Sequence, residues 1–147
     1  KAPIHLVWQV LTDLSGWPQW NPDVQSVTVH GEIGPGTTFK WKAGGARLVS
    51  KLQDVDPLRK IAWTGRSLGI RAAHVWHLRE HKGGTRVVTE ESFEGVVARL
   101  FADRMWRILV RSLENGLEAL RLESERRVGW KSKIFTSDEA RGMSLRP

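Results

Sequence analysis

The sequence predicts an α+β domain in which a curved antiparallel sheet is covered on its concave side by one long C-terminal helix. From residue 24 onward apolar and polar side chains alternate, which is the period of a half-buried strand. Short segments with glycine or proline separate the alternating runs. They favour antiparallel hairpins, because each parallel crossover needs about a dozen residues or more. From residue 96 the apolar period changes to three and four, as in an amphipathic helix.

The region before the sheet predicts a helix followed by a turn. Residues 3–14 place apolar side chains at a helical period, with Pro3 suited to a first-turn position and Ser15-Gly16 ending the run. Residues 17–22 hold two prolines and are interpreted as one helical turn or a structured loop. Their tryptophans, Trp17 and Trp20, either pack this loop or lie at the mouth of a ligand cavity and gate it.

Six alternating runs rich in Val, Thr, Trp and Ile predict six strands. They cover residues 24–31, 37–45, 46–55, 60–69, 70–81 and 84–95. Side chains of one parity carry the largest apolar groups and are assigned to the concave face. They are Val27, Val29, Phe39, Trp41, Leu48, Ser50, Leu52, Ile61, Trp63, Ala72, His74, Trp76, Leu78, Val87, Thr89, Glu91 and Phe93. The opposite parity collects Lys40, Lys42, Lys51, Arg66, Arg71, Arg79 and Arg86, which suits a solvated outer face.

The long helical pattern runs over residues 96–127. Its apolar positions are Val97, Phe101, Met105, Ile108, Leu109, Leu113, Leu117 and Leu120. Gly116 interrupts this stripe and either permits close packing against the sheet or leaves space beneath the helix. After residue 127 the period is lost, so we expect one domain over 1–127 and a C-terminal tail over 128–147, in which residues 133–136 could pair as a short strand.

Composition narrows the function classes. The 147 residues suit a single domain, and the absence of cysteine excludes disulfides, thiolate-bound zinc and a thiol nucleophile. No apolar stretch approaches the roughly 20 residues of a membrane span, so we expect no stable membrane insertion and a cytoplasmic protein. Eight tryptophans are present and tyrosine is absent. Five tryptophans fall in predicted helices or strands, which favours core or cavity lining: Trp8, Trp41, Trp63, Trp76 and Trp106.

The net charge of +7 is spread along the chain without a dense basic run. We therefore expect no nucleic-acid partner, although such binding through Arg104, Arg107 and Arg111 would show as steeply salt-dependent affinity. These three arginines fall on one side of the predicted helix. They form either a solvated helix face or a stripe that meets phosphates or an anionic membrane.

Two ionisable side chains, His74 and Glu91, point toward the concave side in this assignment. Desolvation would raise the pKa of an unpaired carboxyl there, and a histidine within reach could be its partner. Such a couple could act as acid and base on a carbonyl compound, or both groups could simply hydrogen-bond at the cavity rim.

The remaining patterns predict neither a metal site nor a cofactor. His74 and His77 lie an odd number of residues apart and so face opposite sides of their strand. The paired glycines are interpreted as hairpin turns, because no phosphate-binding loop opens a helix. Ser50 or Ser92 as a nucleophile would need a base and an oxyanion site that nothing in the sequence signals.

A series of short motifs carries a family resemblance. They are Ala2-Pro3, Val7-Trp8, Leu11-Thr12-Asp13, Trp17-Pro18-x-Trp20-Asn21-Pro22, Gly34-x-Gly36-Thr37 with Phe39, Val55-Asp56-Pro57 and Gly84-Thr85-Arg86-Val87. From residue 2 to about 125 the chain resembles the START/Bet v1-like (SRPBCC) superfamily, in its bacterial polyketide cyclase/dehydrase-type branch. The resemblance implies a helix-grip fold. It also implies an N-terminal strand joining the first and last strands, which we expect to lie outside this sequence because only Lys1 precedes the first helix.

We therefore expect binding or transport of a small hydrophobic or amphipathic ligand between the sheet and the C-terminal helix. The expected ligand-binding residues are Phe39, Trp41, Leu52, Trp63, His74, Trp76, Thr89, Glu91, Phe93, Met105 and Leu109. The first alternative, implied by the resemblance, is a polyketide cyclase, aromatase or dehydratase with His74 and Glu91 as catalytic residues. The second is an interaction module whose core is closed by its own tryptophans. A homodimer is left open.

Overall fold

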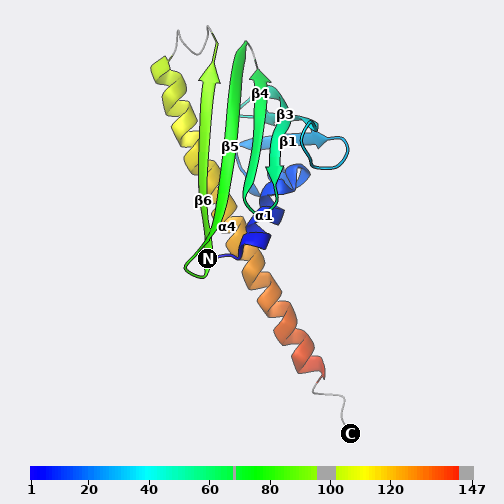
Figure 1. The fold of residues 1–147 in the computed structure, drawn as a ribbon. Helices are drawn as coiled ribbons and strands as arrows, with labels where there is room; N and C mark the ends of the chain where they lie inside the picture. Colours follow the sequence, from blue (N-terminus) through cyan, green and yellow to red (C-terminus); the bar gives the residue numbers. More distant parts are fainter. Residues whose placement is uncertain (68, 96–101, 143–147) are drawn as a thin grey trace.

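The computed structural model describes residues 1–67, 69–95 and 102–142, and it forms one sheet, one long helix and a short helical N-terminal region (Figure 1). The helical elements are α1 (Ile4–Thr12), η1 (Leu14–Gly16), α2 (Trp17–Trp20) and α4 (Ala102–Gly142). The strands are β1 (Val24–Val29), β2 (Thr38–Ala43), β3 (Ala46–Asp56), β4 (Lys60–Ser67), β5 (Ile70–His81) and β6 (Gly84–Glu94). The expected α+β helix-grip fold is confirmed.

A tight turn between α1 and α2 fixes the N-terminal region. The carboxylate of Asp13 accepts a hydrogen bond from the backbone N–H of Gly16 (3.1 Å), and the Trp17 indole N–H donates to the carbonyl of Leu11 (2.9 Å). A Cβ atom on residue 16 would lie 2.3 Å from an Asp13 oxygen, so only glycine fits without displacing the cap. This turn directs the Trp17 side chain into the sheet.

The strands follow one another in sequence order, and every neighbouring pair is antiparallel. Within the residues that the structure describes, β1 and β6 are therefore the two edges of the sheet. The hairpin between β2 and β3 turns at Gly44 and Gly45, both with positive φ, as the paired glycines predicted. A register shift in β3, between Leu52 and Asp54, bends that strand.

The strand register confirms which side chains share the concave face. One row across the sheet aligns Leu52, Trp63, His74 and Glu91. The neighbouring row aligns Phe39, Ser50, Gly65, Ala72 and Phe93. The lysines and arginines of the opposite parity point to the outer face, most of them exposed. Alternation along strands, read from sequence, was sufficient to divide the sheet into its two faces.

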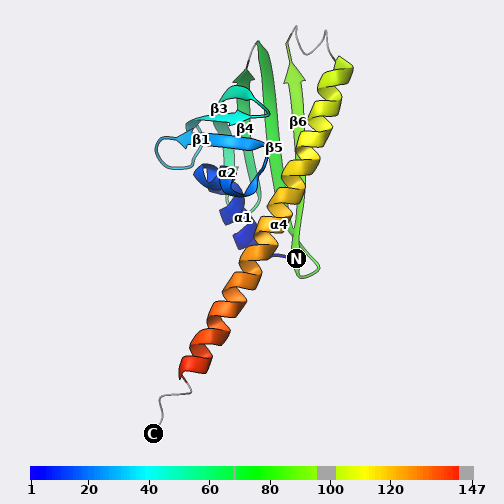
Figure 2. The same cartoon turned by 180° about the vertical axis from the view of Figure 1, so that it is seen from behind.

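Helix α4 covers the concave side, where it contacts α1, α2 and β6. It passes behind the sheet in Figure 1 and in front of it in Figure 2. Gly116 lies over Trp76, and a Cβ atom there would meet the indole ring at 3.7 Å, an ordinary van der Waals contact. Which of the two roles considered for this glycine applies stays a prediction.

The predicted end of the long helix is wrong. Helix α4 continues to Gly142 and projects beyond the sheet, so residues 128–142 are helical and residues 133–136 are not a strand (Figure 1). Residues 96–101, which the apolar pattern included in the helix, lie outside the described residues. The division of the chain into a domain and a separate tail at residue 127 stays a prediction.

Candidate ligand-binding site

One half of the concave face is closed by an aromatic cluster. The indole of Trp17 lies 6.0 Å from the ring of Phe39, 5.7 Å from Trp41 and 5.5 Å from Trp63, measured between ring centroids. Trp17, Phe39 and Trp63 are all buried, together with Leu52 and Ile61. Of the two roles considered for Trp17, packing is therefore confirmed: the residue fills the core.

Small side chains lie between the large ones in the second row of the concave face. Ser50 is buried and accepts a hydrogen bond from the Trp41 indole N–H (3.0 Å). Gly65 lies opposite Ser50, and a Cβ atom at this position would come within 3.0 Å of the serine hydroxyl. With Ala72 next in the row, three neighbouring strands present little volume between Phe39 and Phe93. The indole of Trp41 therefore lies over a part of the sheet with short side chains.

The other half of the concave face, toward the start of β5 and the end of β6, is only partly covered. Ala72, His74, Glu91 and Phe93 all keep some exposure, although their row neighbours on β3 and β4 are buried. On α4, Trp106 precedes Leu109 by one helical turn and so lies toward the same side, yet it is 65% exposed while Leu109 is 5% exposed. Among the residues that the structure describes, the side chains of the sheet and of α4 are therefore not fully buried against each other at this end.

The exposure of Trp106 corrects an expectation from the sequence. All five tryptophans in the regular elements were assigned to the core or to a cavity lining. Trp63 and Trp76 are buried and Trp8 and Trp41 are half-buried, but the Trp106 side chain is largely in solvent. Membership in a predicted helix did not determine burial, and Ile108 of the predicted apolar stripe is likewise 53% exposed.

His74 is held by a chain of hydrogen bonds on the partly covered side. Its Nε2 lies 2.7 Å from the hydroxyl of Thr89, and this hydroxyl donates to the carbonyl of Val75 at 3.2 Å. Because a threonine hydroxyl has one hydrogen, Thr89 accepts from Nε2–H. The Nδ1 lone pair of His74 is then free, and it lies 3.7 Å from Oε2 of Glu91. The imidazole stacks on Trp76 at a centroid distance of 5.4 Å and is tilted by 45° against Trp63 at 4.6 Å.

Burial makes both ionisable groups favour their neutral forms. It lowers the pKa of His74 to about 3 and raises the pKa of Glu91 to about 7. The side chains are 12% and 16% exposed. Near neutral pH the imidazole is uncharged and a large share of the Glu91 carboxyl is protonated, so this pair offers an O–H donor beside a nitrogen acceptor.

The predicted ligand-binding residues divide into buried and partly exposed side chains. Phe39, Leu52, Trp63, Trp76 and Leu109 are buried, and Trp41, His74, Thr89, Glu91 and Phe93 are partly exposed. The side chain of Met105 lies outside the described part of the structure. The set remains a prediction. It left out the small residues Gly65 and Ala72, which the alternation of large and small residues at inward positions could have indicated.

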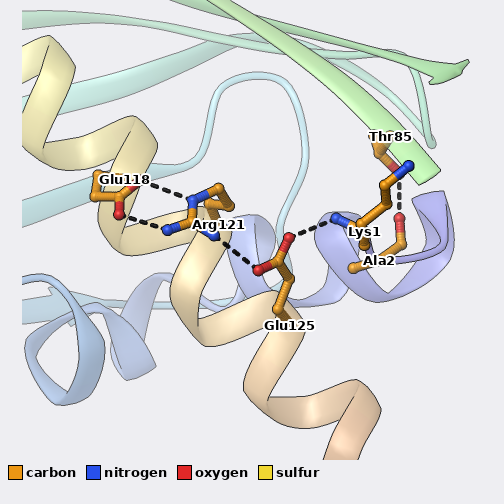
Figure 3. A network of polar contacts seen from close by, with 6 residues as sticks. All are labelled: Lys1, Ala2, Thr85, Glu118, Arg121 and Glu125. Atoms are coloured by element: carbon orange, nitrogen blue, oxygen red, sulfur yellow. Dashed lines mark hydrogen bonds and ion pairs between the residues drawn. The ribbon is translucent and has the colours of Figure 1, made fainter.

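A cavity of about 430 Å³ lies elsewhere, between α4 and the start of the chain. Val7, Val87, Leu117 and Leu120 form its apolar part, and none of the predicted ligand-binding residues lines it. Figure 3 shows the polar network beside it. The amino group of Lys1 contacts Glu125 (2.5 Å), Arg121 bridges Glu125 and Glu118, and Thr85 donates to the carbonyl of Ala2.

Within residues 1–67, 69–95 and 102–142, no three His, Asp or Glu side chains come together as a metal site. Among the helices that the structure describes, none combines the length and apolar character that crossing a bilayer requires.

The fold has relatives of solved structure. A hypothetical protein from Helicobacter pylori is similar with a TM-score of 0.75 at 20% identity, over 84% of this chain and 81% of that chain. The Zhui aromatase/cyclase from Streptomyces sp. R1128 is similar with a TM-score of 0.72 at 21% identity, over 86% and 89%. A START superfamily protein from Mycobacterium smegmatis follows at 0.57 and 12% identity, over 81% and 92%. No match was found among curated proteins.

These structural similarities agree with the helix-grip fold that the motifs implied. Residues 1–125 match the family described as polyketide cyclase / dehydrase and lipid transport, and the chain belongs to that family.

Proposed function

We propose that the protein binds a small, uncharged, largely apolar molecule that carries a carbonyl or hydroxyl group, between the sheet and the first turns of α4. The observation that carries the proposal is the partly exposed pair of His74 and Glu91, set among aromatic rings. Family membership supports a small hydrophobic ligand.

The charge state of this pair supports an uncharged ligand group. The pKa of Glu91 is raised and that of His74 is lowered, so near neutral pH the two groups present one donor and one acceptor with little fixed charge. A carbonyl oxygen can accept from the Glu91 carboxyl, and a hydroxyl can donate to Nδ1 of His74. An anionic ligand group at this place would be repelled by the ionised fraction of Glu91, and the neutral imidazole would offer it no positive charge.

Ligand retention is tested first by native mass spectrometry of the purified protein beside the same sample after denaturation. We expect a mass excess that disappears on denaturation. Titration with polycyclic ketones, followed by tryptophan fluorescence, then measures affinity. Phe93→Ala should weaken binding, whereas Val88→Ala, on the outer face of the same strand, should not. Equal affinities for the two variants would refute this location.

The second candidate function is catalysis of proton transfer, as in a cyclase, aromatase or dehydratase. The specific observation in its favour is the 3.7 Å separation of a free imidazole nitrogen and a carboxyl with a pKa of about 7. Protonated Glu91 would donate to a ketone oxygen while Nδ1 of His74 takes a proton from the neighbouring carbon. The similarity to an aromatase/cyclase agrees with this chemistry.

Catalysis predicts a characteristic pH profile. The acid must be protonated and the base neutral, so turnover of a synthetic poly-β-ketone should be highest between the two pKa values and fall above about pH 7. Glu91→Gln should abolish turnover, and Glu90→Gln, its exposed neighbour, should not. Turnover that survives the combined loss of His74 and Glu91 would refute this mechanism, and ligand binding would remain as the proposed function. Absence of nucleic acid, a homodimer and a cytoplasmic location remain predictions.

A further inference from the structure

We propose that the outer face of the sheet docks on the surface of an anionic lipid bilayer. The face carries a cluster of six exposed cations on four adjacent strands, here called the basic cluster. It consists of Lys40, Lys42, Arg47, Lys51, Arg66 and Arg71. None of the six forms an ion pair with any residue that the structure describes.

The pairing of strands forces like charges together. Lys42 lies directly opposite Arg47 in the β2–β3 ladder, and Arg66 lies directly opposite Arg71 in the β4–β5 ladder. Cβ atoms of such pairs are about 5 Å apart, and like charges at this distance destabilise a sheet. The carboxylate opposite Arg71 on β6, Glu94, makes no ion pair with it in the described residues. This repulsion persists in the free protein, and an array of anions would relieve it.

The rest of the outer face extends the positive charge. Arg79 and Arg86 form a third directly opposed pair on β5 and β6. The outward strand positions together hold nine lysines and arginines but four carboxylates. The cations are the basic cluster with Lys60, Arg79 and Arg86, and the carboxylates are Asp54, Asp56, Glu90 and Glu94. Lys60 pairs with Asp54. Most of the excess charge of the chain therefore lies on this face, although it is dispersed in the sequence.

The composition of the face favours a bilayer over other anionic partners. The large apolar side chains exposed on its strands are Val49 and Val88, and no phenylalanine or tryptophan of the described strands points outward. Protein interfaces concentrate aromatic residues and are depleted of lysine, and single-stranded nucleic acids need aromatic rings for base stacking. Anionic headgroups need only dispersed positive charge. Helix α4 lies on the opposite side of the sheet, so docking leaves the concave side free (Figure 2).

The test compares two triple variants of equal charge. Arg47→Gln, Arg66→Gln and Arg71→Gln remove half of the basic cluster. Arg104→Gln, Arg107→Gln and Arg111→Gln remove three exposed arginines from α4, and each triple lowers the formal charge by three. Both are mixed with vesicles of phosphatidylcholine alone or with about one third phosphatidylglycerol, and binding is measured by co-sedimentation at low and high salt.

We expect wild type to bind only the anionic vesicles and to dissociate at high salt. The sheet triple should lower the partition coefficient on the order of a hundredfold, because each neutralised cation lowers it about fivefold. The helix triple should stay close to wild type. The sheet triple should also melt at a higher temperature than wild type, because like-charge repulsion is removed. That shift shows that any loss of binding is not a loss of folding.

Two results would overturn the proposal. Equal losses in both triples would mean that binding follows net charge and not this face. Failure of wild type to bind anionic vesicles would also reject it, and binding of poly-glutamate through the same three arginines would then assign the face to an acidic protein.

Discussion

The two halves of the concave face are built from the same kinds of residue but differ in what lies opposite them. In the first, α1 and the turn after it insert Trp17 against Phe39 and Trp63, and all three rings are buried. In the second, the facing helix contributes Trp106, which is 65% exposed. The first half is therefore closed by buried rings, whereas the side chains of the second half keep some exposure. The difference arises from the partner element rather than from the strands.

Among the changes that test this contrast, removal of the Trp17 side chain should have the largest effect on the unfolding free energy. Trp17→Ala should cost about 3–5 kcal/mol of unfolding free energy, because a buried indole is removed and its cavity cannot collapse against the rigid sheet. Urea denaturation measures it. If the variant loses less than about 1 kcal/mol, the aromatic cluster is not the stabilising half of the concave face.

The charge state of the second half predicts a pH effect of similar size. The pKa of Glu91 rises from 4.5 when unfolded to about 7 when folded, so its contribution to stability is lost as the pH rises through this window. The loss amounts to about 3 kcal/mol when complete. Unfolding free energies from pH 4 to 9 should therefore fall less steeply for Glu91→Gln than for wild type.

His74 acts in the opposite direction. Its folded pKa of about 3 means that stability is lost as the pH falls below 6.5 toward 3.

For the Glu91 prediction, one result would be contradictory. If the unfolding free energies of wild type and Glu91→Gln fall in parallel as the pH rises above neutral, Glu91 is not buried in the folded protein.

Loss of the hydrogen bond that orients the His74 imidazole should have a smaller effect on the unfolding free energy. Thr89→Val removes the acceptor for Nε2–H of His74 with little change in shape, and should cost about 1–3 kcal/mol. Nitrogen chemical shifts of His74 should then show that the preference for the Nε2–H tautomer is lost. An unchanged tautomer would mean that Thr89 does not determine it. Thr85→Val, on the same strand, should leave the His74 tautomer unchanged, because the Thr85 hydroxyl donates to the carbonyl of Ala2 and not to His74.

The smallest effect on stability is expected at Trp106. Trp106→Ala should change the unfolding free energy by no more than about 0.5 kcal/mol, because the ring is mostly solvated. Its effect on ligand affinity should be larger, measured by the same fluorescence titration. A destabilisation close to that of Trp17→Ala would show that both halves are closed in solution.

Strand faces were predictable from the sequence because alternation is a local property. The positions of His74, Thr89 and Glu91 on the concave side follow from parity alone, and the register then brings them together. The end of α4 was not predictable in this way. Beyond residue 127 the helix projects past the sheet, so no core enforces an apolar period there.

The basic cluster was visible in the sequence only as residues of one parity. Arg66 and Arg71 are five positions apart, and Lys42 and Arg47 likewise, so a reading along the chain finds no dense run. Only the hairpin register makes each pair direct neighbours. Burial of Trp17 and exposure of Trp106 depend on tertiary contacts in the same way, so the neighbouring sequence does not predict the exposure of either side chain.

The aromatic cluster also gives the protein an optical signature. The chain has no tyrosine, so indoles dominate its near-ultraviolet absorption. Trp17 lies 5.5 Å from Trp63 and 5.7 Å from Trp41 at fixed ring angles, which couples their electronic transitions and produces strong circular dichroism. Coupling between Trp17 and Trp63 reports on the closed core. A ligand that moves Trp41 away from Ser50 would alter only the coupling to that ring, so one spectrum separates folding from occupancy.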